Sequence, residues 1–485
     1  MKMPRPLLFA ILATCVSSAS LAATQVGEVS YSRGVLTGQI DGQQPRLIGK
    51  GVGLHNGETL NTGSRGFALI KLDDGTKMTL RPNTTFKIEN LESQEGSENA
   101  LLSLIRGGFR ALTGVISKRN PDAFRINTSV ATIGIRGTEF DVRICESTEC
   151  DDEEKATGKR ATRDSRVVGR IAVLKGKASA VEDGKDSRRL RVGSALFERD
   201  QVQTGIKSYA VIAFNDKTRV TMSPKSAFRI EEHEFKPDVP DENNSFLSFL
   251  QGGLRLVTGA IGRLNKKAFK VATPTATIGI RGTGFDLVCE GACVSNSAMH
   301  NPASDSMLGQ FLKFFVRPAY ALGDGNGMYA KVWRGAIELQ LSGDPFVVDN
   351  GRTVYLSNNF SQPLFIPDIP ARLRTMEGAP RPDKVTVDDD LFSEVSPDSI
   401  EPGAFFNVRK GELTIEGVDG NTIELGPGEA GSSNGGQTVR LAFVPTFQKF
   451  DPIPDPAKIT VQSEKLMNLF GERAADKEAF ECTVQ

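Results

Sequence analysis

The feature that most constrains the fold of this chain is an internal duplication. Residues 107–142 and residues 252–287 share about 20 identities in roughly 36 positions without a gap. They read GGFRALTGVISKRNPDAFRINTSVATIGIRGTEFDV and GGLRLVTGAIGRLNKKAFKVATPTATIGIRGTGFDL. Weaker matches continue upstream, so each repeat covers about 130 residues, which is an ordinary domain size. The sequence therefore predicts two tandem domains of related fold.

The pattern of apolar residues within each repeat is typical of an all-β protein. Short alternating runs are interrupted about every eight to twelve residues by Gly, Asn, Pro or Asp-Gly. The run Phe67–Leu72 leads into an Asp-Asp-Gly turn, and Thr76–Leu80 leads out of it. We expect a hairpin here with Met78 and Leu80 facing inward, because side chains alternate between the two faces of a strand.

The most repeated part of the sequence predicts a kinked strand. Apolar residues occupy odd positions at Ile133 and Ile135 but even positions at Phe140 and Val142. Because the side-chain period of a strand is two, the strand must change face between these pairs through a bulge or corner. Gly137 is the residue that can adopt the positive φ such a kink often needs.

The second repeat carries the same kink at Gly282, between Ile278, Ile280 and Phe285, Leu287. A guanidinium beside each kink could bind carbonyls released from the strand ladder or pair with the aspartate that follows, Asp141 or Asp286. Capture of a phosphate or carboxylate is the functional alternative, and we favour the structural one. The candidate residues of the two kinks are Arg136, Gly137, Thr138, Arg281, Gly282 and Thr283.

At this motif the chain resembles the FecR-type domain of bacterial envelope proteins, best known from the periplasmic part of regulators of iron-siderophore uptake. The residues that carry the resemblance, with their second-repeat partners, are Gly63, Asp74-Gly-Thr76, Gly107, Phe124, Ala131-Thr-Ile133 and Ile135-Arg-Gly-Thr-Glu-Phe140. The resemblance implies a β-rich, solenoid-like or meander-like unit in each repeat. Signal-relaying members place an anti-sigma region and a membrane helix before this domain. Neither is found here, and Gly284 replaces the usual acid, so we do not expect direct control of a sigma factor.

The N-terminal residues read as a secretory signal peptide, residues 1–22. A basic start is followed by an apolar run from Leu7 to Val16 and by the small-residue site Ser20-Leu-Ala22. A membrane anchor is the alternative, but the run is short for a bilayer. Lipidation at Cys15 is a further alternative. We expect no transmembrane helix in the mature chain, and a periplasmic, secreted or cell-surface location.

The remaining cysteines predict disulfides. Cys145 and Cys150, and likewise Cys289 and Cys293, form close pairs just after the kink of each repeat, and an oxidising compartment would let each pair close a small loop. Cys482 is left without an evident partner. Metal ligation needs clustered histidines or paired cysteine motifs, whereas the three histidines of this chain, His55, His233 and His300, are scattered, so we expect neither a metal nor another cofactor.

The segments outside the repeats complete the expected organisation. An amphipathic helix is predicted within an insertion at 295–327, packing on the β units or docking on a membrane or partner. Val332-Trp-Arg-Gly335 resembles the start of the second repeat, Val168–Gly176. Charge runs at 149–154 and 188–191 are interpreted as solvated linkers and loops. The expected divisions are a first FecR-like domain at 24–150, a charged linker at 151–165, a second FecR-like domain at 166–358, a Pro-rich linker at 359–402, a separate C-terminal β meander at 403–450, and a tail with a short helix at 451–485.

These features favour a protein that binds other molecules rather than an enzyme. Basic and acidic residues balance at 59 each, which argues against nucleic-acid binding. The glycine-rich, serine and histidine motifs of common enzyme families are missing from the sequence. We expect an adaptor or sensor scaffold that docks on an unidentified envelope protein through exposed strand edges. A surface or matrix protein that binds polysaccharide or peptidoglycan is the alternative, although a single Trp and five Tyr offer few platforms for sugar rings.

Overall fold

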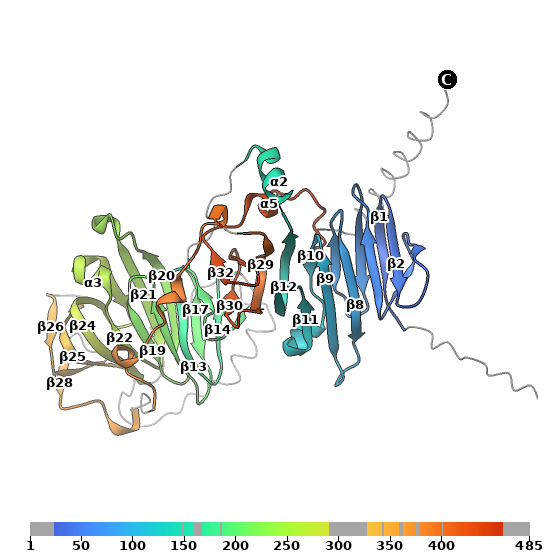
Figure 1. Ribbon diagram of the computed structural model, residues 1–485. Helices are drawn as coiled ribbons and strands as arrows, with labels where there is room; N and C mark the ends of the chain where they lie inside the picture. The colour runs from blue at the N-terminus through green and yellow to red at the C-terminus, as the bar shows by residue number, and fades with distance from the viewer. Residues whose placement is uncertain are drawn as a thin grey trace, which may run out of the picture.

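The computed structural model places most of the chain in two β sheets (Figure 1). The signal peptide, the insertion with its expected helix, Cys293 and the C-terminal helix with Cys482 all lie outside the described residues. The structure describes residues 24–147, 149–159, 167–184, 187–290, 327–341, 344–357, 362–373, 378–399 and 401–458.

Each sheet has 16 strands, so the all-β prediction with two tandem units is confirmed. The strands of the first sheet are β1 (Gln25–Arg33), β2 (Leu36–Ile40), β3 (Arg46–Leu47), β4 (Gly53–His55), β5 (Glu58–Thr62), β6 (Phe67–Leu72), β7 (Lys77–Leu80), β8 (Thr85–Glu92), β9 (Asn99–Arg106), β10 (Gly108–Leu112), β11 (Phe124–Asn127), β12 (Ala131–Cys145), β29 (Gly403–Gly417), β30 (Thr422–Leu425), β31 (Ala430–Ser433) and β32 (Thr438–Leu441).

The second sheet is built from the strands between these two groups. They are β13 (Gly169–Lys175), β14 (Ala178–Val181), β15 (Arg188–Leu190), β16 (Ala195–Leu196), β17 (Gln201–Thr204), β18 (Tyr209–Phe214), β19 (Arg219–Met222), β20 (Ala227–Glu234), β21 (Asn244–Gln251), β22 (Gly253–Val257), β23 (Phe269–Ala272), β24 (Thr277–Glu290), β25 (Gly327–Gln340), β26 (Phe346–Asp349), β27 (Thr353–Ser357) and β28 (Leu364–Ile366). We call the two sheets with their cores the first unit and the second unit.

Helices are short and lie in the connections between strands. The α-helices are α1 (Ile116–Arg119), α2 (Glu149–Thr157), α3 (Ala260–Leu264) and α5 (Thr446–Lys449). The 3-10 helices are η1 (Pro121–Ala123), η2 (Pro240–Glu242), η3 (Lys266–Ala268), η5 (Ala371–Leu373), η6 (Pro382–Lys384), η7 (Asp389–Phe392) and η8 (Pro397–Ser399). The charged linker expected at 151–165 therefore begins as part of helix α2.

The duplication holds at the level of strand order. The first sheet runs β3-β2-β5-β8-β9-β11-β12-β10-β7-β6-β1-β4, and the second runs β15-β14-β17-β20-β21-β23-β24-β22-β19-β18-β13-β16. Only the pairs β9–β11 and β21–β23 are parallel among the described ladders. The predicted hairpin is β6–β7, with Met78 and Leu80 both 0% exposed in the core.

The kinked strand in each unit lets one sheet enclose one core. Ile133 and Ile135 before the kink, and Phe140 and Val142 after it, all pack into the same hydrophobic cluster. The first half of β12 pairs with β11 and the second half with β10, so the strand joins two arms of a curled sheet. Outward-pointing side chains before the kink therefore project from one arm, and those after the kink project from the other arm, on a different side.

The C-terminal meander is not a separate unit, which differs from the sequence prediction. Strand β29 pairs with β12 along its whole length, from Ala131 opposite Gly417 to Cys145 opposite Gly403. It thereby completes the first sheet in the way that β25 completes the second by pairing with β24. The second unit is thus inserted between two adjacent strands of the first, and β29–β32 lie between the two units (Figure 1).

A short motif marks the two completing strands. Val332-Trp-Arg-Gly335 in β25 and Val408-Arg-Lys-Gly411 in β29 occupy equivalent places opposite the kinks of β24 and β12. Val332–Gly335 lies within the second unit as expected, but its likeness to Val168–Gly176 does not mark an equivalent position, because Val168–Gly176 contains β13, the first strand of the same unit, whereas β25 is its last long strand.

Truncation after residue 402 tests this nested arrangement. The truncated chain loses β29, so the backbone groups along one edge of β12 and the core beneath it lose their cover. We expect residues 108–145 to lose protection from hydrogen exchange, while residues 209–257 of the second unit keep theirs. Hydrogen-exchange mass spectrometry measures both regions in one sample. A chain truncated after residue 458 is the control, and unchanged protection of residues 108–145 would contradict the nesting.

Candidate functional site

The kink in β12 has the predicted glycine at its centre. Gly137 has a φ of +56°, and its counterpart Gly282 has a φ of +69°. The register of β12 against β29 shifts between Arg136 and Glu139, which is the local irregularity expected from the change of face. The second unit shows the same shift between Arg281 and Gly284. The kinks therefore form in both units for the same backbone reason.

A buried threonine connects each kink to both neighbouring strands. Thr138 donates through its Oγ1 to the carbonyl oxygen of Glu412 at 3.0 Å, and its N–H donates to Thr113 Oγ1 at 2.9 Å. Thr283 repeats this arrangement, with its Oγ1 donating to the carbonyl oxygen of Ala336 at 2.9 Å and its N–H donating to Thr258 Oγ1 at 3.1 Å. These bonds satisfy groups that leave the regular ladder at the kink, so a structural role accounts for both threonines.

A glycine on the facing strand allows the kink to approach closely. Gly411 has a φ of +83°, and a Cβ there would lie 2.5 Å from the carbonyl oxygen of Gly137. Gly335 faces the other kink with a φ of +68°. The sequence analysis missed both glycines, although the shared Val-x-Arg/Lys-Gly motif would have revealed them.

The guanidinium of Arg136 does not pair with Asp141, which corrects one of our two structural interpretations. Asp141 accepts hydrogen bonds from Arg110 Nε at 2.6 Å and from Arg409 Nε at 2.8 Å. Arg136 and Asp141 lie on opposite sides of the kink and project from different arms of the curled sheet. Arg136 instead lies close to Glu424, with 3.7 Å between its Nη1 and Glu424 Oε2. Its Nε and Nη1 atoms are buried with no hydrogen-bond partner among the described residues, and burial lowers its pKa.

The side chain of Arg281 lies outside the described residues, and its pairing with Asp286 stays a prediction. Asp286 itself accepts two hydrogen bonds from Arg255, at 2.8 Å and 3.1 Å, and one from Trp333 Nε1 at 2.9 Å. Trp333 also explains the departure at position 284, since a Cβ on Gly284 would lie 2.3 Å from its ring.

Arg136 belongs to a layer of buried charges between the two units. From the first unit this layer, which we call the interface network, draws on β12 and β29–β32, and from the second unit on residues around β13 and β15. Taking two charges out of water is costly, so each is tolerated here only because another lies nearby. Its members are Arg136, Glu412, Glu424, Glu429 and Arg440 of the first unit and Arg170, Arg188, Ser194 and Asp200 of the second.

One ion pair in the interface network is almost completely buried. Arg170 is 0% exposed and pairs through Nη2 with Glu429, while its Nη1 donates to the carbonyl of Gly193 at 3.1 Å. The other carboxylate oxygen of Glu429 accepts the N–H of Gly426 at 2.7 Å. Burial lowers the pKa of the nearby Arg440 to about 10. Separating the units would expose both charges or leave one of them buried and unpaired.

Glu412 occupies the centre of the interface network. Arg188 of the second unit lies 3.8 Å from Glu412 Oε1 and also pairs with Asp200. Burial raises the pKa of Glu412 to about 7, an effect that the charges of Arg188 and Arg136 oppose and that of Glu424 reinforces. Our interpretation of the basic run at 188–191 as a solvated face is wrong for Arg188, because tertiary packing buries it against an acid from a distant strand.

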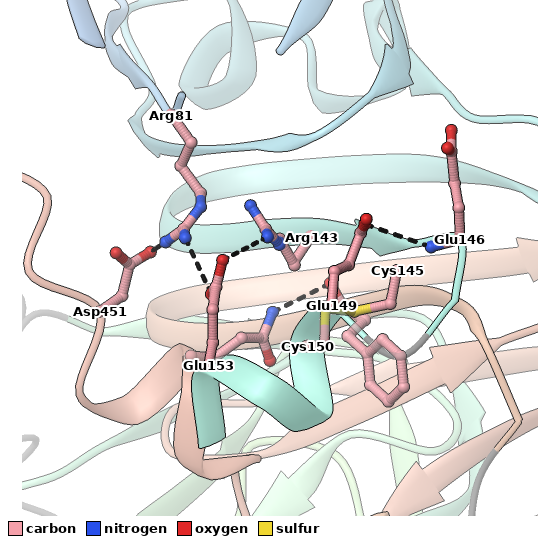
Figure 2. The surroundings of a disulfide bond; sticks show 10 residues. Arg81, Arg143, Cys145, Glu146, Glu149, Cys150, Glu153 and Asp451 are labelled. Atoms are coloured by element: carbon pink, nitrogen blue, oxygen red, sulfur yellow. Dashed lines mark hydrogen bonds and ion pairs between the residues drawn. A yellow bond between two sulfur atoms is a disulfide. The ribbon is translucent and has the colours of Figure 1, made fainter. Parts of the chain in front are cut away.

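The predicted disulfide Cys145–Cys150 is present, and it joins the end of β12 to helix α2. Figure 2 shows Glu153 of this helix between Arg81 and Arg143, accepting hydrogen bonds at 3.1 Å and 2.8 Å, with Asp451 also paired to Arg81. The acidic run is therefore partly engaged with the sheet rather than fully solvated. Cys289 is also disulfide-bonded.

None of these arrangements resembles a metal centre. No group of three or more His, Cys, Asp or Glu side chains suited to a metal ion occurs in the part of the chain that the structure describes. None of the helices in the described ranges has the length and apolar character needed to cross a bilayer. The six candidate residues form two separate kinks, one in each sheet, and the anion-binding alternative for their arginines stays a hypothesis.

Comparison with known proteins identifies the repeated units. The model of the FecR family, "FecR protein", matches residues 58–179 and 200–298. The chain carries a tandem pair of FecR-type domains. The first match ends at residue 179, within β14 of the second unit. A search among curated proteins finds no match.

Two crystal structures of "a putative anti-sigma factor from Parabacteroides distasonis ATCC 8503" are similar to part of the chain. They are 14% and 13% identical to it, each with a TM-score of 0.23, and each comparison covers 34% of this chain. The chain spans 58% of the length of these structures. At such a TM-score the likeness is no basis for inferring fold or function.

Substitution of Gly411 tests the close approach at the kink. Gly411→Ala places a methyl group against the backbone of β12 at a positive φ, so we expect a loss of more than about 2 kcal/mol in the free energy of unfolding. Gly420→Ala is the matched control, since Gly420 has a φ of +81° but no atom within 4 Å of the place that a Cβ would take. Chemical denaturation measures both. Equal losses in the two variants would show that φ alone, and not the contact, sets the requirement.

The raised pKa of Glu412 predicts a pH dependence of stability. The folded state holds this proton more tightly than the unfolded chain, so the stabilisation is present below pH 4.5 and is lost as the pH rises towards about 7. Glu412→Gln imitates the protonated acid, and we expect it to unfold at higher denaturant than the wild type at pH 7.5 but not at pH 4.5. The difference can reach about 3 kcal/mol.

The control for this experiment is Glu416→Gln, which removes an exposed acid from the same strand. Its stability relative to the wild type should not change between the two pH values. If Glu412→Gln behaves in the same way, the buried acid does not govern the pH response of the fold.

Proposed function

We propose that this chain is a non-catalytic, extracytoplasmic adaptor or sensor scaffold that binds a protein of the bacterial envelope. The FecR-type domains support this proposal, because the resemblance to that family implies a protein of the bacterial envelope that takes part in signalling. The disulfide Cys145–Cys150 suits an oxidising compartment outside the cytoplasm. Adaptor function here means that each unit presents a fixed surface to a partner.

The observation that carries the proposal is the interlocking of the two units. Because the second unit is inserted between β12 and β29, two chain connections rather than one join it to the first. The interface network then favours a single relative orientation, since buried charges tolerate few alternative pairings. A scaffold that must hold two binding surfaces at a set spacing needs this kind of rigidity.

Two exposed sheet edges are the surfaces that we propose for docking. Strand β3 in the first unit and β28 in the second each pair with a single neighbour among the described strands. Leu47 in β3 is 78% exposed and Leu364 in β28 is 62% exposed. Strand β28 lies at one end of the molecule, and β1 and β2 lie at the other (Figure 1). A partner strand could add to either edge through main-chain hydrogen bonds.

One observation weakens the alternative of glycan binding. Sugar-binding surfaces commonly use an open aromatic ring, and Trp333 is not open in this structure. Arg381 stacks over its ring at 4.1 Å from the centroid, and its indole N–H is already donated to Asp286. Binding of polysaccharide or peptidoglycan therefore has less support than binding of a protein.

Site-specific photo-cross-linking in intact cells tests the proposal. A photoreactive amino acid at position 47 or 364 samples the two edges, and one at Ile206, which is 70% exposed in a turn, is the control. We expect the edge positions to capture the same envelope protein repeatedly and the control position to capture it at least about tenfold less. Mass spectrometry of the products identifies the partner.

Two results would count against the adaptor. Capture of glycan or cell-wall fragments alone would favour the surface-binding alternative. Equal capture of unrelated proteins at all three positions would mean that the edges have no selectivity.

A further inference from the structure

The same outer surface of each unit is covered by the chain that follows that unit's last strand. In the first unit we define the outer face by the outward residues of β7, β10, β12 and β29, which point away from the core. Residues 446–458, the first strap, cross this face after β32. In the second unit the equivalent face of β19, β22, β24 and β25 is crossed by the second strap, residues 367–373 and 378–385, after β28.

The first strap is held by side chains of the sheet rather than by strand pairing. Arg110 of β10 donates to the carbonyl oxygen of Ile453 at 2.8 Å, and Arg81 pairs with Asp451. Phe447 packs edge-on against Phe405 of β29, with 5.3 Å between ring centroids. These contacts combine an apolar anchor with cationic donors that recognise carbonyl and carboxylate oxygens.

The second strap is held in the same manner. Lys331 of β25 donates to Asp368 Oδ1 at 2.8 Å, and Arg219 of β19 donates to the carbonyl of Val385 at 2.8 Å. Thr221, in the same strand as Arg219, donates to the carbonyl of Pro380 at 3.0 Å. Ile369 packs with Val288 and Tyr329 on the outer side of the sheet, where Phe447 lies in the first unit.

The two straps have a similar composition that suits this mode of binding. The first strap contains Ile-Pro-Asp at 453–455, and the same triplet at 366–368 joins the end of β28 to the second strap, in each case near further prolines. Proline lacks an N–H, so a proline-rich segment cannot add a regular strand and binds best where the receptor supplies the donors. The equivalent faces of the two units thus bind the same kind of segment from their own chain.

The first face is the more basic of the two. Arg81 and Arg143 stand where the second unit has Ser223 and Val288, and Arg409 stands where it has Trp333. Asp141 of β12 pairs with Arg110 and Arg409 from within the sheet, whereas the acids that pair with Arg81 and Arg143 come from outside it, Glu153 from α2 and Asp451 from the first strap (Figure 2). Charge complementarity therefore favours an occupant that places a carboxylate against Arg81, as Asp451 does.

We propose that the outer face of the first unit is a binding site for a proline-rich segment of a partner protein that presents a carboxylate to Arg81, and that the first strap occupies it as an intramolecular competitor. This inference deepens the proposed adaptor function, on which it rests, by naming a class of partner and a site separate from the sheet edges. The partner segment displaces the strap from Arg81 and Arg110. One hydrophobic side chain of the partner then packs against Phe405, where Phe447 packs in this structure.

Peptide binding to the full chain tests the site. The probe is a fluorescein-labelled peptide with the sequence of residues 446–458, followed by fluorescence anisotropy. The double variant Asp451→Asn/Asp455→Asn weakens the strap in cis, and we expect it to bind the probe at least about tenfold more tightly than the wild type. A probe with both aspartates changed to asparagine should lose this gain, and so should the triple variant that adds Arg81→Gln.

A second version of the chain controls for two problems, a strap that stays bound and a variant that misfolds. A protease site inserted between Leu441 and Val444 allows the strap to be cut after folding, and mass spectrometry shows when it has left. The cut protein with its strap removed should bind the probe. No binding to that protein overturns the proposal, as does a shift of the full chain to stable dimers on loosening the strap, because the occupant is then a second copy.

The outcomes also separate this inference from the proposed function. Probe binding without capture of any envelope protein at the sheet edges supports the strap site and counts against edge docking. Capture at the edges with no probe binding to the cut protein keeps the adaptor and overturns the strap site.

Discussion

The pairing of β12 with β29 is the interaction on which the rest of this structure depends. Strand β12 forms the corner of the first sheet, and its far edge carries a long row of main-chain donors and acceptors that need a partner. That partner, β29, follows the inserted second unit in the sequence. At the kink a hydrogen bond joins Thr138 to Glu412, which lies 274 positions later in the chain. The second unit, which lies between these two strands in the sequence, must therefore begin and end at this corner.

The buried charges between the units follow from this constraint. Strands β29 and β30 bring Glu412 and Glu424 to the surface that faces the second unit, and β13 and β15 bring Arg170 and Arg188 to meet the first. Such pairs add little net stability compared with apolar packing, but a mismatch is costly. In the scaffold that we propose, these pairs select one orientation of the two units.

Local pattern in the sequence was sufficient for the repeats, the β6–β7 hairpin, the kinks at Gly137 and Gly282 and the disulfide Cys145–Cys150. Each depends on residues that are neighbours in the chain. The role of β29 could not be predicted in this way, because the hydrophobic alternation of a strand does not say which edge it joins. The same applies to Arg188, whose burial is decided by a distant acid; only Gly411, through its likeness to Gly335, offered a usable signal.

The insertion of one domain within another also sets an order of events during synthesis. When the ribosome has completed the second unit, all of its strands are present and it can fold, whereas the first unit still lacks its last four. Until residues 403–441 emerge, the apolar corner strand of the first unit has an open edge that other chains could join. That edge stays open while residues 146–402 are made, and this is the interval in which the nascent chain is most exposed to pairing with other strands.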